Sequence, residues 1–195
     1  MTLKQKQQAL EVVTKEIKRC RICKKDTIGK AVPGEGNADA DIVFLGEAPG
    51  KKEAVEGRPF IGPAGKVLRG LIKEAGIKDK DVFITSPVKR LPKHVTPTPE
   101  EVAHGRTHLL KQVEVIQPKI IVLMGRIATL AMLQKNVSVA KEHGKIIEQD
   151  GRKYLITYHP AAPLYSPKVR VELEKDFKML KQLVSNQHVS KSVKQ

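Results

Sequence analysis

Tryptophan is absent from this chain, and aromatic residues make up only 4% of it. Cysteine occurs twice, at Cys20 and Cys23, which excludes a scaffold held together by several disulfides. No apolar run approaches the roughly 18 residues that a membrane-spanning helix needs. Residues 1–20 also lack the apolar segment and small-residue cleavage site of a secretory signal. We therefore expect an intracellular protein of the cytoplasm, associated with the nucleoid if the source is prokaryotic.

Acidic residues are fewer than basic residues in this chain. The chain carries 36 Lys and Arg against 21 Asp and Glu, which gives a net charge of +15. Such an excess attracts polyanions, of which nucleic acid is the commonest in a cell. A thermophilic or generally lysine-rich proteome would produce the same excess. The charge therefore favours a nucleic-acid partner without identifying one.

Apolar patterning predicts strands that alternate with helices. Short apolar runs predict buried strands at Asp41–Gly46, Asp81–Thr85, Lys119–Met124 and Tyr154–Thr157. Helical spacing and capping signals predict helices over residues 3–19, 64–75, 98–116 and 126–133, and a last helix that ends near Val184. This alternation is typical of a three-layer α/β sandwich, in which helices flank a central four-stranded parallel sheet. We expect one domain over residues 1–184 and a flexible polar tail over 185–195.

Parallel sheets bind ligands at the carboxyl ends of their strands. Residues 46–50 (GEAPG) follow the first strand and place a carboxylate, Glu47, in a tight turn. In residues 57–65 (GRPFIGPAG), Phe60 is either a plug of the core or a platform on which a base stacks. Gly62 and Gly65 open the next helix, which suits a phosphate. His159 follows the last strand, and both a structural and a functional role fit that position.

Three segments in this order carry a resemblance: GEAPG, GRPFIGPAG and YHPAA (residues 158–162). With the intervening sequence, from about Cys20 to Phe177, the chain resembles the iron–sulfur (family 4) uracil-DNA glycosylases. Proteins of that family flip the target nucleotide out of DNA into a pocket. The uracil-DNA glycosylase fold and a DNA partner are implied by the same likeness.

The resemblance also implies roles for individual residues. His159 matches the donor to the uracil O2, and Glu47 lies in the motif that holds the attacking water. Phe60 matches the aromatic residue that stacks on the base. The base-binding positions are Gly46, Ala48, Phe60 and Ser86. The positions implied to contact DNA are Gly50, Gly62, Pro63, Gly65, Pro163, Leu164, Lys168 and Arg170.

The sequence departs from the family at the metal ligands. The family holds a [4Fe–4S] cluster with four cysteines, and Cys20 and Cys23 match the first two. The third and fourth positions fall on Arg90 and Gly105, neither of which offers a thiolate. His94 and His104 lie nearby in the sequence and are candidate substitutes. We expect that the cluster is lost and that the chemistry needs no cofactor.

A second departure is Ser86, where the family usually has asparagine. An asparagine amide presents a fixed donor and a fixed acceptor to the base, whereas a hydroxyl rotates to suit either. We therefore expect weaker discrimination, or another deaminated base such as hypoxanthine.

Three functions compete. The favoured one is a monofunctional, monomeric uracil-DNA glycosylase of base excision repair, because no lysine nucleophile occurs in the matched motifs. A non-catalytic relative that binds damaged or single-stranded DNA is the alternative, although it would not need Glu47, Phe60 and His159 together. An enzyme of small nucleotides is disfavoured by the net charge of +15.

Overall fold

The computed structural model describes the backbone of residues 1–192 and the side chains of these residues other than Asp79 and 185–192. A six-stranded sheet with the order β2-β4-β3-β6-β8-β7 forms its centre. The four inner strands are mutually parallel and are β4 (Val82–Thr85), β3 (Ile42–Leu45), β6 (Ile120–Met124) and β8 (Arg152–Thr157). These strands confirm the predicted parallel sheet.

Two edge strands were not predicted. β2 (Glu35–Gly36) pairs antiparallel with β4, and β7 (Ile146–Gln149) pairs antiparallel with β8. The sheet is therefore mixed, with a parallel centre and antiparallel edges.

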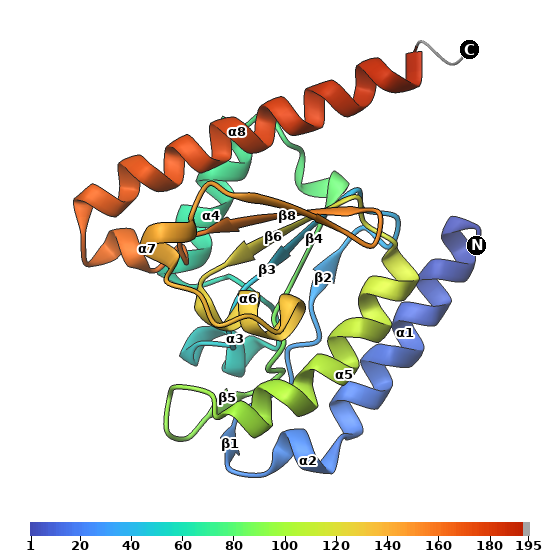
Figure 1. Ribbon diagram of the computed structural model, residues 1–195. Helices are drawn as coiled ribbons and strands as arrows, with labels where there is room; N and C mark the ends of the chain where they lie inside the picture. The colour runs from blue at the N-terminus through green and yellow to red at the C-terminus, as the bar shows by residue number, and fades with distance from the viewer. Residues whose placement is uncertain (193–195) are drawn as a thin grey trace.

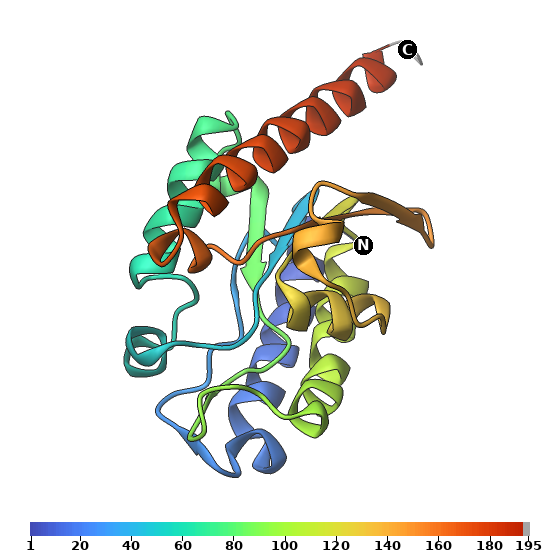
Figure 2. The ribbon, with the colours of Figure 1, turned by 60° about the vertical axis from the view of Figure 1, so that its left-hand side comes forward.

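Helices cover both faces of the sheet, which explains why β3, β4 and β6 are buried along their whole length. α4 (Pro63–Glu74) and α8 (Pro167–Ser192) cover one face, and α5 (Pro99–Ile116) and α6 (Arg126–Leu133) cover the other (Figure 1). α1 (Leu3–Arg19) lies alongside α5. Figure 2 shows the same layers from the side, with α8 running past the end of the sheet. α8 continues beyond Val184, where the sequence predicted its end.

The start of α5 follows the predicted capping pattern. Thr98 accepts a hydrogen bond from the Glu101 amide at 3.2 Å, and the Glu101 carboxylate accepts one from the Thr98 amide at 2.8 Å. Pro99 occupies the first helical position, where the missing amide proton costs nothing. The polar cap fixes where α5 begins and hence where the preceding loop ends.

Short elements complete the chain. β1 (Thr27–Ile28) and β5 (Leu91–Pro92) form a separate two-stranded sheet. The remaining short elements are α2 (Arg21–Lys24), α3 (Lys51–Glu56), α7 (Val139–Glu142) and the 3₁₀ turns η1 (Asp79–Asp81) and η2 (Ala162–Leu164). Within residues 1–192, no helix combines the length and the apolar content that a membrane crossing demands.

Candidate active site at the strand ends

The loops that follow β3, β4 and β8 meet at a cavity of about 490 Å³. This is the carboxyl edge of the parallel strands, where such sheets bind ligands. The predicted site residues that line the cavity are Glu47, Ala48, Gly50, Phe60, Gly62, Pro63, Ser86, His159 and Leu164. The structure thus brings together residues that lie more than 100 positions apart in the sequence.

Two glycines create the space for Phe60. A Cβ at Gly46 would lie 2.6 Å from Cζ of Phe60, and a Cβ at Gly65 would lie 1.8 Å from its carbonyl oxygen. Phe60 itself has a φ of 50°, in the left-handed region that non-glycine residues rarely adopt. Gly46 and Gly65 therefore fix the position of the aromatic ring.

His159 faces the same space as a neutral imidazole. Its ring centroid lies 5.8 Å from that of Phe60. Burial lowers the pKa of His159 to about 4, so the ring is uncharged at neutral pH. Nδ1 accepts a hydrogen bond from the Ala161 amide at 3.1 Å. The single ring proton must then sit on Nε2, which makes that atom a hydrogen-bond donor.

Glu47 is a partly buried carboxyl on the cavity wall. Burial raises its pKa, and the positive charge of Arg126, the first residue of α6, opposes that rise. A carboxylate held in this way accepts a hydrogen bond from water or stabilises a nearby positive charge.

The hydroxyl proton of Ser86 is used in a hydrogen bond within the protein. Its Oγ is buried and donates to the backbone carbonyl of Val88 at 2.8 Å. Only its lone pairs remain for a ligand, so Ser86 presents an acceptor to the cavity. The described conformation thus gives the hydroxyl one direction, whereas the sequence suggested that it rotates to suit either base; the base preference stays a prediction.

The N-terminus of α4 already holds an anion. The carboxylate of Glu53 accepts hydrogen bonds from the amides of Ile61 and Gly62, at 2.9 and 2.8 Å. The sequence had suggested a phosphate in this position. The role of Glu53 was not predicted, because it lies in α3, a short helix that the sequence analysis missed.

The rim of the cavity carries exposed apolar side chains. Leu164 and Tyr165, at and just after η2, have exposed fractions of 50% and 87%. Tyr165 was missed, although an aromatic residue beside a predicted DNA-contacting segment is a signal in so aromatic-poor a chain. Lys51 and Lys52 also line the cavity and follow GEAPG directly.

Other predicted DNA contacts lie apart from the cavity lining. Lys168 and Arg170 belong to the first turn of α8. Arg170 donates through Nε to Glu174 at 2.6 Å and lies 3.9 Å from the Glu74 carboxylate. These neighbours offset its charge. Pro163 belongs to η2, beside Leu164.

A separate group of potential metal ligands lies beside the N-terminal half of α5. The ligand atoms of Cys20, Cys23, His104 and His108 all lie within 4.8 Å of one another. The other candidate, His94, instead contacts the Glu101 carboxylate at 3.1 Å.

The two remaining positions do not fit the four-thiolate cluster that the resemblance implies. Arg90 fills one with a guanidinium that donates to the carbonyls of Gly29 and Lys18, at 2.7 and 3.3 Å. At the other, a Cβ on Gly105 would lie 2.2 Å from the carbonyl oxygen of Pro87. The absence of the cluster stays a prediction.

Comparison with known proteins gives a consistent result. The family model described as "Uracil DNA glycosylase superfamily" matches residues 33–184. A type-4 uracil-DNA glycosylase of Saccharolobus solfataricus is 42% identical, over 93% of this chain and 89% of its own length. A type-4 enzyme of Archaeoglobus fulgidus is 40% identical over 90% and 94%, respectively, and one of Thermotoga maritima is 41% identical over 80% and 83%.

Proposed function

Since the chain belongs to the uracil-DNA glycosylase superfamily, we propose that it is a monofunctional DNA glycosylase of base excision repair. It hydrolyses the N-glycosidic bond of uracil, or of a similar deaminated base, in DNA and acts as a monomer. One observation carries the proposal. An aromatic platform (Phe60), a neutral imidazole donor (His159) and a carboxylate (Glu47) line one cavity at the strand ends.

The base enters the cavity after rotating out of the stack. Extrusion costs a few kcal/mol, which contacts in the pocket must offset. The ring of Phe60 supplies stacking, while Gly46 and Ala48 bring the backbone close to the base. The volume of about 490 Å³ lies within the ~300–1,000 Å³ typical of small-molecule sites. Lys51 and Lys52 offer positive charge for the phosphates that flank the target nucleotide. Gly50 has no side chain, so the DNA strand can approach the protein backbone there.

His159 stabilises the leaving base. Negative charge grows on the uracil O2 as the glycosidic bond breaks, and Nε2–H donates to that oxygen. A donor fixed in advance by the Ala161 amide needs no reorganisation during the reaction. Loss of one such donor typically lowers the rate about 10²–10³-fold.

Glu47 acts on the sugar side. Departure of the base leaves a cationic sugar, which a carboxylate stabilises while it orients the attacking water. Burial raises the pKa of Glu47, and the positive charge of Arg126 opposes that rise and favours the ionised form that this role requires.

Ser86 selects the base by polarity. Its Oγ accepts a hydrogen bond but has no free proton to donate, because that proton is held by the Val88 carbonyl. The ring N3–H of uracil and the N1–H of hypoxanthine both satisfy such an acceptor. Cytosine carries a lone pair at N3 instead, and two facing acceptors repel. Ser86→Ala should therefore narrow the rate difference between uracil and cytosine, and an unchanged ratio would remove Ser86 from base selection.

The test of the function is single-turnover cleavage of labelled DNA that carries uracil, hypoxanthine, xanthine or no lesion. We expect release of one or more deaminated bases, with rates that collapse in His159→Ala and Phe60→Ala. The control is His94→Ala, which removes an exposed imidazole outside the cavity lining. Tight DNA binding without release of any base would favour the non-catalytic relative instead, and elution as a dimer in size-exclusion chromatography would contradict the monomer.

A further inference from the structure

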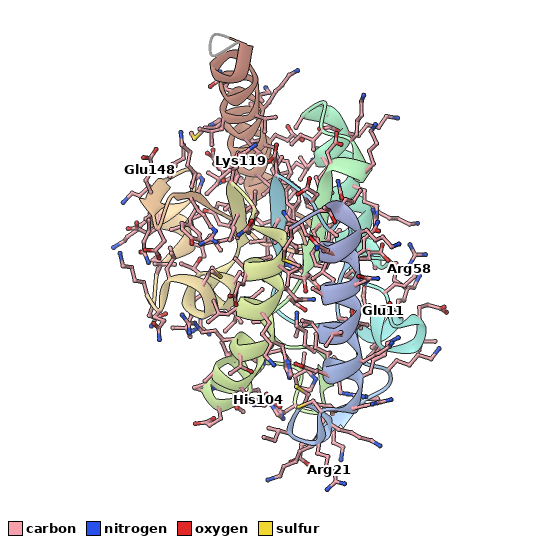
Figure 3. All side chains as sticks on the ribbon, turned by 90° about the vertical axis from the view of Figure 1, so that its right-hand side faces the viewer. Glu11, Arg21, Arg58, His104, Lys119 and Glu148 are labelled. Carbon is pink, nitrogen blue, oxygen red and sulfur yellow. The ribbon has the colours of Figure 1, made fainter. Side chains whose placement is uncertain are left out.

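Four metal-binding side chains that the glycosylase chemistry does not use meet where α2 packs against α5. Cys20 is the N-cap of α2 and Cys23 lies within this short helix, whereas His104 and His108 lie on successive turns of α5. Figure 3 shows His104 on the part of α5 that lies beside the C-terminal end of α1. Two thiols and two imidazoles thus come from two segments about 80 residues apart.

The four ligand atoms are already close. All of them lie within 4.8 Å of one another, and Cys20 Sγ is 3.1 Å from Nε2 of His104. Zinc bonds to sulfur at about 2.3 Å and to nitrogen at about 2.0–2.1 Å. A tetrahedron with these bonds has edges of roughly 3.3–3.8 Å, so small side-chain movements would complete it.

His108 supplies an independent observation. Both of its ring nitrogens are buried, and neither has a hydrogen-bond partner among the described residues. Leaving a buried polar group without a partner is unfavourable, so such groups are rare unless a ligand satisfies them. A metal ion bound through one of these nitrogens would remove that cost.

We propose that Cys20, Cys23, His104 and His108 bind a single zinc ion in tetrahedral geometry. Two cysteines and two histidines form a common closed structural zinc site. The two thiolates also neutralise the charge of the ion. A four-iron cluster needs more widely spaced ligands, because four irons and four sulfides must fit between them.

The site would support the pocket without taking part in the reaction. Gly105, between the two histidines, packs its Cα against the carbonyl of Pro87, the residue after Ser86. Zinc would fasten α2 to α5 and so hold this close contact in place. The inference is independent of the proposed glycosylase function, since it concerns how the fold is held and not what the cavity cleaves.

Metal analysis of the purified full-length protein is the first test. We expect about one zinc per chain in the wild type and in His94→Gln, whose imidazole lies outside the group. We expect almost none in Cys23→Ser and His104→Gln, which alter partly exposed ligands and so limit the risk of unfolding.

Cobalt replacement tests the geometry. Co²⁺ added to the metal-free protein should give the visible bands of a tetrahedral ion and thiolate charge transfer, both lost in Cys23→Ser. A chelator should lower the melting temperature of the wild type and of His94→Gln, but not that of Cys23→Ser. Failure to bind zinc or cobalt, or isolation with iron and acid-labile sulfide, would overturn the proposal. Uracil release is measured separately, so either idea can fail alone.

Discussion

Gly46→Ala is the substitution that most directly tests how the cavity works. The added Cβ would lie 2.6 Å from Cζ and 2.8 Å from Cε2 of Phe60. Carbon atoms prefer separations of about 3.5–4.0 Å, so the ring must retreat by roughly 1 Å. Phe60 cannot retreat by a simple backbone adjustment, because its carbonyl is packed against Gly65 and its φ is already 50°.

The ring must therefore move into the space reserved for the base. A displacement of about 1 Å in a reactant-positioning group can cost about 10²-fold in rate. We expect single-turnover cleavage of uracil-containing DNA to slow by about that factor in Gly46→Ala. Stability should change little, since the cavity offers the ring somewhere to go.

Gly70→Ala is the matched control. This glycine lies within α4, and a Cβ there would meet nothing within 4 Å among the described residues. The same chemical change should stabilise the protein by up to about 1 kcal/mol, because alanine is the better helix former. Its cleavage rate should match the wild type. A Gly46→Ala enzyme within threefold (about 0.7 kcal/mol) of wild type would refute the reasoning.

Three further predictions concern the strand ends and the rim. The pKa of His159 is lowered to about 4 from 6.5, so the unfolded chain takes up this proton first as pH falls. The free energy of unfolding should therefore decrease as pH falls from about 6.5 to 4. Urea unfolding at pH about 7 and pH about 4.5 measures this decrease, which should be smaller by about 2–3 kcal/mol in His159→Gln than in the wild type. Asp176 accepts from the Thr157 hydroxyl at 2.6 Å. Asp176→Ala should cost about 1–3 kcal/mol in thermal unfolding and slow cleavage, because Thr157 ends the strand that places His159; unchanged melting would argue against this support. Tyr165→Ala should weaken cleavage of duplex uracil-DNA about tenfold but spare single strands, because an exposed wedge matters only where a duplex must be opened; equal losses on both substrates would contradict that role.

The parallel centre of the sheet was predictable because its strands are uninterrupted apolar runs. The β7–β8 hairpin was missed although its turn carries a strong signal. Asp150 and Gly151 have φ values of 51° and 72° and join Gln149 to Arg152, its pairing partner. Asp-Gly is a favoured pair for such a two-residue turn. The flanking strand Ile146–Gln149 is mostly exposed and so shows no apolar run.

The strand-end rule pointed to the loops after all four predicted strands, and three of these loops supply Glu47, Ser86 and His159 to the cavity. The rule says nothing about which groups face one another. That Gly46 makes room for Phe60, and that the Ser86 proton is held by Val88, depends on distances between separate loops. Membership of the glycosylase superfamily, predicted from three ordered motifs, is confirmed by the family comparison.

Of the two histidines proposed as zinc ligands, the sequence analysis considered His104 but not His108. Proximity in the sequence suggested His94 and His104, yet the predicted helix from Thr98 already placed His104 and His108 on one face, four residues apart. His94 lies before that helix, and its imidazole contacts the Glu101 carboxylate instead. A side chain at position 105 would instead collide with the Pro87 carbonyl. Because Gly105 packs against Pro87, position 105 cannot carry a ligand side chain. Ligands from α5 can therefore reach Cys20 and Cys23 only from the helix face that carries His104 and His108.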